Sequence, residues 1–209
     1  MRTYPLRSVF GFPKMKHTHT VKAAMGQYYK AVLLLQTQDA QGQVVYTIIG
    51  WLSPYGCGEC AKLLEHAWVK NPFVINLTSL LCPEGKFPQG ARVVWAGDYA
   101  DPEPAPIDDN LYSHCEEIEQ TDVLPGICMT PFPFVLNHDL KQYVRVGPEG
   151  TLHPLPILTC EGNGRGGGDL PSSHSWFPLA GTWARALISM AAAPPDDSWT
   201  ELVLPESDY

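Results

Sequence analysis

Proline and glycine recur along the whole chain, and they limit every helix and strand to a short segment. The 209 residues include 20 prolines and 18 glycines. Proline fixes φ and removes a backbone donor, and glycine favours turns, so long helices are excluded. Apolar residues make up 44% of the chain, which suits a globular protein. The composition therefore predicts one core built from short elements.

Two pairs of apolar runs have the pattern of β-hairpins. The first hairpin covers about 28–52, with turn-forming residues at 39–43 between its strands. The second pairs 132–136 with 142–146 across an Asn- and Asp-containing connection. A compact apolar run at 92–96 predicts a buried strand that emerges at its carboxyl end.

Helical signals are fewer. Asn71 can cap a helix, Pro72 suits its first position, and the apolar spacing that follows forms one face as far as Pro83. An acidic, mostly exposed helix is predicted within 108–120.

Three further segments complete the pattern. The run at 155–160 predicts a strand, 183–190 fits a strand or a short helix, and 60–68 fits a helix or an extended segment. Hairpins without regular strand-helix alternation favour an α+β fold, with a mainly antiparallel sheet and one or two short helices on one side.

Charge divides the chain into three parts. Residues 1–24 carry five basic and no acidic side chains, and they predict a loosely ordered extension. We expect residues 25–190 to form a single α+β domain that begins at Met25. We expect residues 191–209 to form an acidic, loosely attached tail. Beyond residue 24 the chain has nine basic and 22 acidic side chains. Such an acidic body disfavours extended nucleic acid as a partner, because phosphate binding relies on Lys and Arg.

Cysteine content and hydropathy indicate the cellular compartment in which the chain is expected to fold. Six cysteines in a chain this long do not form the dense framework of a small secreted scaffold, so we expect a reducing, cytoplasmic setting. No apolar run is long enough to predict a membrane span. Cys57 and Cys60 have the spacing of half a zinc site, but no second ligand pair follows nearby, which favours free thiols and no metal.

The glycine-rich segment Gly162–Asp169 is the most distinctive motif. It matches G-x-G-x-x-G in letters, but the prolines at 171 and 178 disfavour the helix that a dinucleotide site requires. Glycines can still expose consecutive N–H groups to an anion, and Arg165 adds a fork of donors. A plain connecting loop is the alternative interpretation.

Acids and bases are present without a recognisable catalytic pattern. Glu65, His66, Asp98 and Asp169 can transfer protons only if at least two of them reach one cavity. The other histidines are interpreted as packed or solvated imidazoles. Asp98 lies where the predicted strand emerges, a position that can face a pocket or simply cap a turn.

Several stretches carry a resemblance to known sequences. MGQYYKAVLL, RVVWAGDYAD and HPLPILTCEGNGRGGGD, together with KLLEHAWVKNPFV and FVLNHDLKQYV, resemble a group of small proteins from bacteria and their phages. The resemblance covers about 25–188 and implies a domain start at Met25, without implying an activity. Its shared motifs include the residues Glu65, His66, Asn71, Asp98, Tyr99, Asn137, Asn163, Arg165 and Asp169.

The leading hypothesis is a module that binds a small polar or nucleotide-like molecule. Its pocket would join the Gly162–Asp169 loop to the end of the 92–96 strand, without a cofactor. The predicted ligand-binding residues are Asp98, Tyr99, Asn163, Arg165, Asp169, Glu65 and His66. A hydrolase that uses Glu65, His66, Asp98 or Asp169 is one alternative, and a protein-interaction domain without a pocket is the other. The sequence does not indicate an oligomeric state.

Overall fold

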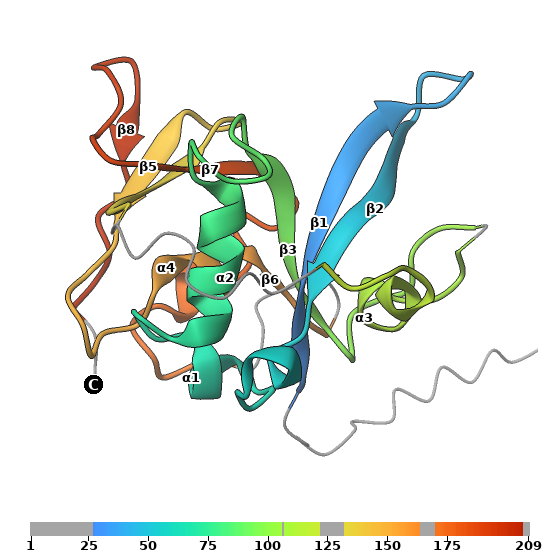
Figure 1. The fold of residues 1–209 in the computed structure, drawn as a ribbon, viewed down its shortest axis with the longest axis horizontal. Coiled ribbons are helices and arrows are strands. Elements are labelled where there is room, and N and C mark those ends of the chain that lie inside the picture. Colours follow the sequence, from blue (N-terminus) through green and yellow to red (C-terminus); the bar gives the residue numbers. More distant parts are fainter. Residues whose placement is uncertain (1–26, 106, 122–131, 164–169, 207–209) are drawn as a thin grey trace, which may run out of the picture.

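A computed structural model describes residues 27–105, 107–121, 132–163 and 170–206. In these ranges, eight strands form one sheet in the order β2-β1-β3-β7-β4-β5-β8, and β6 pairs with β3 outside this path (Figure 1). The pairs β3–β6 and β5–β8 are parallel, and the others are antiparallel. The α+β class with a mainly antiparallel sheet is therefore confirmed.

The elements are short, as the prolines and glycines predict. The strands are β1 (Tyr29–Gln38), β2 (Val44–Leu52), β3 (Ala91–Gly97), β4 (Phe134–Asn137), β5 (Gln142–Arg145), β6 (Cys160–Glu161), β7 (Leu187–Ala191) and β8 (Thr200–Glu201). The α-helices are α1 (Leu63–His66), α2 (Pro72–Leu81), α3 (Leu111–His114) and α4 (Pro154–Thr159). Short 3-10 turns lie at Tyr55–Cys57, Cys115–Glu117 and Phe177–Leu179.

Both predicted hairpins are confirmed as β1–β2 and β4–β5. Strand β1 is buried on both faces, which explains its continuous apolar run. Ala31 and Leu33 face one core, whereas Val32 and Leu34 face a second, smaller core. The two-residue period of a strand thus divides neighbouring side chains between two layers.

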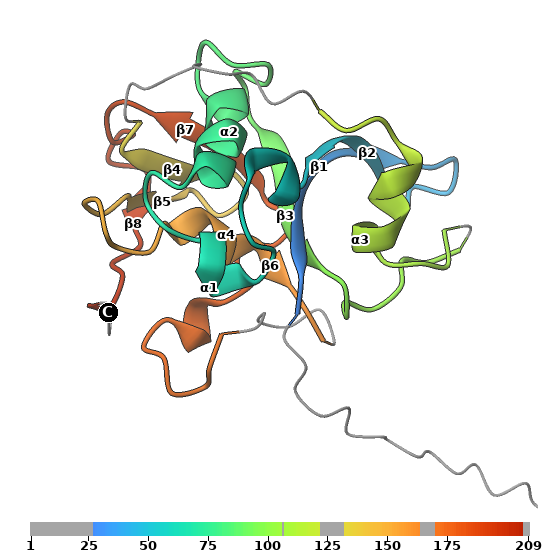
Figure 2. The same cartoon turned by 60° about the horizontal axis from the view of Figure 1, so that its bottom comes forward.

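The helices cover both faces of the sheet. Helices α1, α2 and α4 lie on one side of β1 and β3, and α3 lies on the other (Figures 1 and 2). Asn71 caps α2 as predicted, because its side chain accepts a hydrogen bond from the Phe73 N–H at 2.9 Å. The larger core contains residues of α1, α2 and α4, and the smaller one contains Leu111 and Cys115. No helix in the described ranges is long and apolar enough to span a bilayer.

Residues 155–159 lie in helix α4, so the strand predicted over 155–160 is wrong there. His153 accepts a hydrogen bond from the Leu155 N–H at 3.2 Å and caps α4, and Pro154 occupies its first turn. Proline is well suited to that position because its missing N–H has no helical partner to lose. Only Cys160 continues as a strand, in β6.

The described part of the tail is attached to the body, which corrects the expectation of a loose tail. Strand β8 pairs with β5, and Leu202 donates its N–H to the Tyr143 carbonyl at 2.7 Å. The Trp176 indole N–H donates to the Pro205 carbonyl at 2.8 Å. Backbone pairing therefore fixes this segment to the sheet.

We expect the two positions Leu33 and Leu35 on β1 to differ sharply in their effect on stability. Leu33 is fully buried, whereas Leu35 is 51% exposed. Leu33→Ala should lower the free energy of unfolding by about 3 kcal/mol, because it leaves a cavity. Leu35→Ala should lower it by less than about 0.5 kcal/mol. Urea unfolding at constant m-value measures both, and equal losses would contradict the burial of Leu33 and the exposure of Leu35.

Candidate functional site

The turn after β3 holds Asp98 in a defined position. The Asp98 N–H donates to the Tyr28 carbonyl at 3.0 Å, and the Asp98 carboxylate accepts from the Tyr28 N–H at 3.1 Å. These two bonds extend the β1–β3 pairing by one residue. Asp98 therefore terminates the sheet, and Tyr99 follows in the same turn.

The glycine-rich segment begins beside this turn. Asn163 forms an isolated antiparallel bridge with Ala100, and the parallel pairing of β6 with β3 leads into it. The contact is close, because a Cβ added to Gly97 would lie 2.7 Å from the Glu161 carbonyl. The structure thus brings Asp98, Tyr99 and Asn163 together, whereas Arg165 and Asp169 lie outside the described residues.

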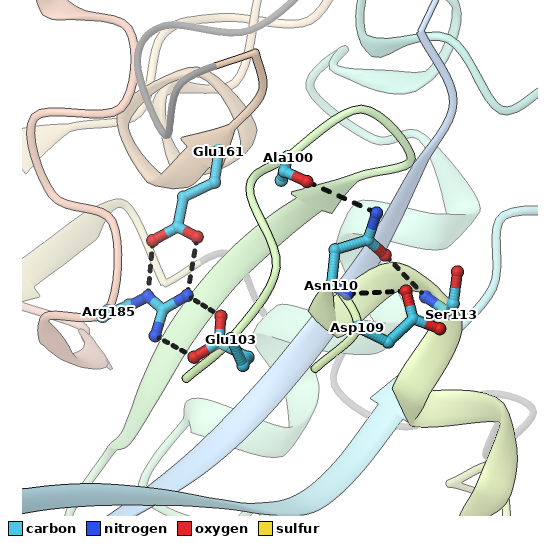
Figure 3. Close-up of polar contacts among 7 residues, drawn as sticks. All are labelled: Ala100, Glu103, Asp109, Asn110, Ser113, Glu161 and Arg185. Carbon is cyan, nitrogen blue, oxygen red and sulfur yellow. Dashed lines mark hydrogen bonds and ion pairs between the residues drawn. The ribbon is translucent and has the colours of Figure 1, made fainter. Parts of the chain in front are cut away.

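Asn110 connects the turn to α3. Its amide nitrogen donates to the Asp98 carbonyl at 3.0 Å. It also donates to the Ala100 carbonyl at 3.4 Å, and its amide oxygen accepts from the Ser113 N–H at 3.0 Å (Figure 3). One side chain therefore caps α3 and satisfies two turn carbonyls. Sequence reasoning missed Asn110, although an Asn directly before a helical segment is a recognisable cap signal.

A buried ionic cluster lies next to β6, with Arg185 at its centre. The guanidinium binds the Glu161 carboxyl group at 2.5 and 2.8 Å and that of Glu103 at 2.6 and 3.0 Å (Figure 3). Glu103 and Glu161 are 7% and 4% exposed. Burial lowers the pKa of Arg185, but the hydrogen bonds and charges of Glu161 and Glu103 outweigh burial and raise it above its ordinary value.

This ionic cluster joins three distant parts of the chain. Removal of one partner would leave a buried charge uncompensated, which strongly destabilises a fold. Sequence reasoning missed Glu103 and Arg185, and it considered Glu161 only as one of the acids available for proton transfer. Only Glu161 offered a signal, since it directly precedes the glycine-rich segment.

Glu65 and His66 occupy structural positions in α1. Glu65 accepts a hydrogen bond from the Lys62 N–H at 3.1 Å and closes the start of the helix. Lys62 also bridges to Tyr28, the residue that binds Asp98, so Glu65 and Asp98 lie at the same end of the sheet. Glu65 and Asp98 are thus connected through the backbone pairing of Lys62 with Tyr28.

Both ring nitrogens of His66 are engaged inside the core. Nδ1 lies 2.9 Å from the Cys60 carbonyl, which can only accept, so Nδ1 carries the proton. Nε2 then accepts the Trp95 indole N–H at 2.8 Å. Burial lowers the pKa of His66 to about 4, despite the opposing hydrogen bond with Cys60. His66 therefore fastens α1 to β3 as a neutral imidazole.

Cys57 and Cys60 are free thiols in the structure. Burial raises the pKa of Cys57, although the hydrogen bond from Asn76, with 3.6 Å between nitrogen and sulfur, opposes this effect. A raised thiol pKa lowers the fraction of thiolate, which is the reactive and metal-binding form. Among the described residues, no group of three or more His, Cys, Asp or Glu side chains has the arrangement of a metal site.

A pocket of about 790 Å³ lies elsewhere, lined by α2, by Met190 of β7 and by the segments that precede β4 and follow β5. Its apolar wall includes Val69, Val74, Ile75, Val146 and Met190. We call it the α2 pocket. None of the described residues that the sequence indicated for binding lines it.

His153 lines the α2 pocket and is 5% exposed. Burial lowers its pKa to about 3, so the ring is neutral at physiological pH. Its Nδ1 accepts the Leu155 N–H. In the described part of the chain, no group is hydrogen-bonded to its Nε2. The interpretation of His153 as an ordinary packed imidazole overlooked both its capping role and this second nitrogen.

The mouth of the α2 pocket carries an ion pair. Lys70 Nζ lies 2.5 Å from the Glu149 carboxylate, and both side chains are more than half exposed. Lys70 has φ 70°, a left-handed conformation that non-glycine residues rarely adopt. Because the pair is exposed, it contributes little to stability, but it neutralises the charge on both sides of the entrance.

Comparison with known proteins gave no relative from which function can be transferred. No family model, curated protein or solved structure matches the chain.

The neutral state of His66 predicts a specific dependence of stability on pH. Its pKa rises from about 4 in the folded chain to the ordinary 6.5 on unfolding, so acid favours the unfolded state between these values. The contribution of neutral His66 to the free energy of unfolding is fully present above pH 6.5, and at pH 5 it is lower by about 2 kcal/mol.

His66→Gln removes this titration while keeping an amide that can accept from Trp95. Relative to the variant, the native protein should therefore lose about 2 kcal/mol of its stability advantage between pH 7.5 and pH 5. Urea unfolding of both proteins at the two pH values measures the change. A difference in stability that stays constant with pH would show that His66 titrates normally in the fold.

Proposed function

We propose that this protein binds a small molecule and that the molecule occupies the α2 pocket. The observation that carries the proposal is a pocket of about 790 Å³ with a buried histidine in its wall. Binding sites for small molecules commonly have volumes of about 300–1,000 Å³, apolar walls and a few polar groups that set orientation. The α2 pocket has each of these features.

Its position in the fold also supports binding. The wall is contributed by α2, by the segment after β5 and by β7, which are far apart in the sequence. Backbone pairing and core packing hold these elements in place. A preformed site orders few groups on binding, and this favours affinity.

The turn after β3 and the glycine-rich segment stay a second candidate location, for a polar or nucleotide-like molecule. The Ala100–Asn163 bridge supports it, because the segment starts beside Asp98. The ionic cluster of Arg185 would hold the residues next to that location in fixed positions. It ranks second because Arg165, which would supply the charge, lies outside the described residues.

The remaining alternatives have weaker support. A hydrolase requires a free base, yet Glu65 and His66 are engaged in helix capping and core hydrogen bonds. An interaction domain would use exposed apolar side chains such as Leu35 and Val45, which are 51% and 40% exposed on the first hairpin.

Blocking the α2 pocket should abolish ligand binding without unfolding the protein. Ile75 is half-buried in the wall, so Ile75→Trp should fill part of the space, and Ile75→Val should leave it open. We expect Nile red to bind with a stoichiometry of one and its affinity to fall at least about tenfold in Ile75→Trp only. Fluorescence titration and circular dichroism measure binding and fold. No binding of Nile red, or equal affinity in both variants, would contradict the proposal.

The second location has its own test, a thermal-shift screen with nucleotides. If Arg165 contributes to a site, a nucleotide at about 100 times its Kd should raise Tm by several degrees, and Arg165→Ala should remove the rise. Arg145→Ala, at an exposed position of β5, is the matched control and should leave the rise intact. An absence of any rise, or a rise unaffected by Arg165→Ala, would remove this location from consideration.

A further inference from the structure

His153 has a defined tautomer, because its partner can only donate. The Leu155 backbone N–H lies 3.2 Å from Nδ1, so Nδ1 presents its lone pair. In a neutral imidazole the proton must then be on Nε2. The ring is 5% exposed and lines the α2 pocket. His153 thus offers one N–H donor whose partner is missing from the described residues.

The other polar side chains inside the α2 pocket have used their protons. Thr78 donates its hydroxyl to the Val74 carbonyl at 2.9 Å, and Ser79 donates to the Ile75 carbonyl at 2.7 Å. Both bonds stay within α2, as is common for hydroxyl side chains in helices. The Nε2–H of His153 is therefore the side-chain donor that a ligand can use in the interior of the pocket.

The electrostatics of the α2 pocket disfavour a charged ligand. Lys70 at the mouth is already paired with Glu149, so the entrance has no net charge. Inside, the walls are mostly apolar, and burial of an unpaired ion there is strongly unfavourable. A neutral molecule loses much less hydration on entering.

We infer that the α2 pocket takes a neutral, mostly apolar molecule with one carbonyl or hydroxyl oxygen, and that this oxygen accepts the Nε2–H of His153. The inference rests on the proposed binding function and names its ligand class. Apolar walls hold the body of the molecule, and His153 fixes its orientation. A ligand without the acceptor leaves a buried donor unpaired, which is the basis of strong discrimination in polar recognition.

The test compares three ten-carbon molecules that differ in one group: 2-decanone, decane and decanoate. Each competes with Nile red for the full-length protein in a fluorescence titration. We expect 2-decanone to bind about tenfold more tightly than decane, the effect of one matched hydrogen bond in a desolvated site. Decanoate should bind more weakly than 2-decanone, because the pocket offers its charge no unpaired cation.

His153→Asn separates the donor from the helix cap. The Asn oxygen can accept the Leu155 N–H as Nδ1 does, but no group replaces Nε2–H at the same reach. We expect the variant to bind decane with native affinity and to lose the preference for 2-decanone. Should His153→Asn fold poorly, His153→Ser supplies another cap that lacks the donor.

Two results would overturn the inference while leaving the binding function intact. The first is an equal affinity for 2-decanone and decane in the native protein, or a preference that survives in His153→Asn. The second is tightest binding of decanoate with loss of that binding in Lys70→Met, which would assign an anionic ligand. If Nile red does not bind at all, the proposed function fails instead.

Discussion

Strand β3 is the constraint on which the rest of the structure depends. It pairs with β1, β6 and β7, and both of its faces are buried. Trp95 in this strand is fully buried and donates its indole N–H to His66 at 2.8 Å. That bond satisfies a polar atom in the core and fastens α1 to the sheet. A buried polar pair of this kind is unfavourable in any arrangement that separates its members, so it selects one packing.

The motif residues around the end of β3 act largely through the architecture. Asp98 terminates the sheet with two hydrogen bonds to Tyr28, and Asn110 satisfies the carbonyls of the turn. Beneath them, Arg185 binds Glu103 and Glu161 in a cluster that ties separate segments together. These motif residues therefore have identifiable structural contacts. The glycine at position 97 illustrates this, because a side chain there would collide with Gln27 and the Glu161 carbonyl.

The α2 pocket arises from elements that the sequence gives no reason to connect. Its walls come from α2, from residues after β5 and from β7, and they meet only because β7 inserts between β3 and β4. His153 enters this wall through its role as the cap of α4, a helix that the sequence pattern presented as a strand. Its Nδ1 serves the backbone, which directs the protonated Nε2 to other partners. One side chain thus supplies a structural bond and a candidate recognition group.

Local physics set much of what could be predicted, and long-range pairing decided the rest. The sequence determined both hairpins, the buried strand predicted at 92–96 and the capped helix that begins at Pro72, because turn residues, Asn caps and apolar periodicity act over a few positions. It also indicated that the turn containing Asp98 and the segment containing Asn163 lie close together. The tertiary structure alone decided that His66 is sealed in the core, that Thr200–Glu201 joins the sheet, and that His153 reaches a pocket. These outcomes depend on which distant segments become neighbours, and the free energy of such pairing belongs to the complete fold and to no single segment.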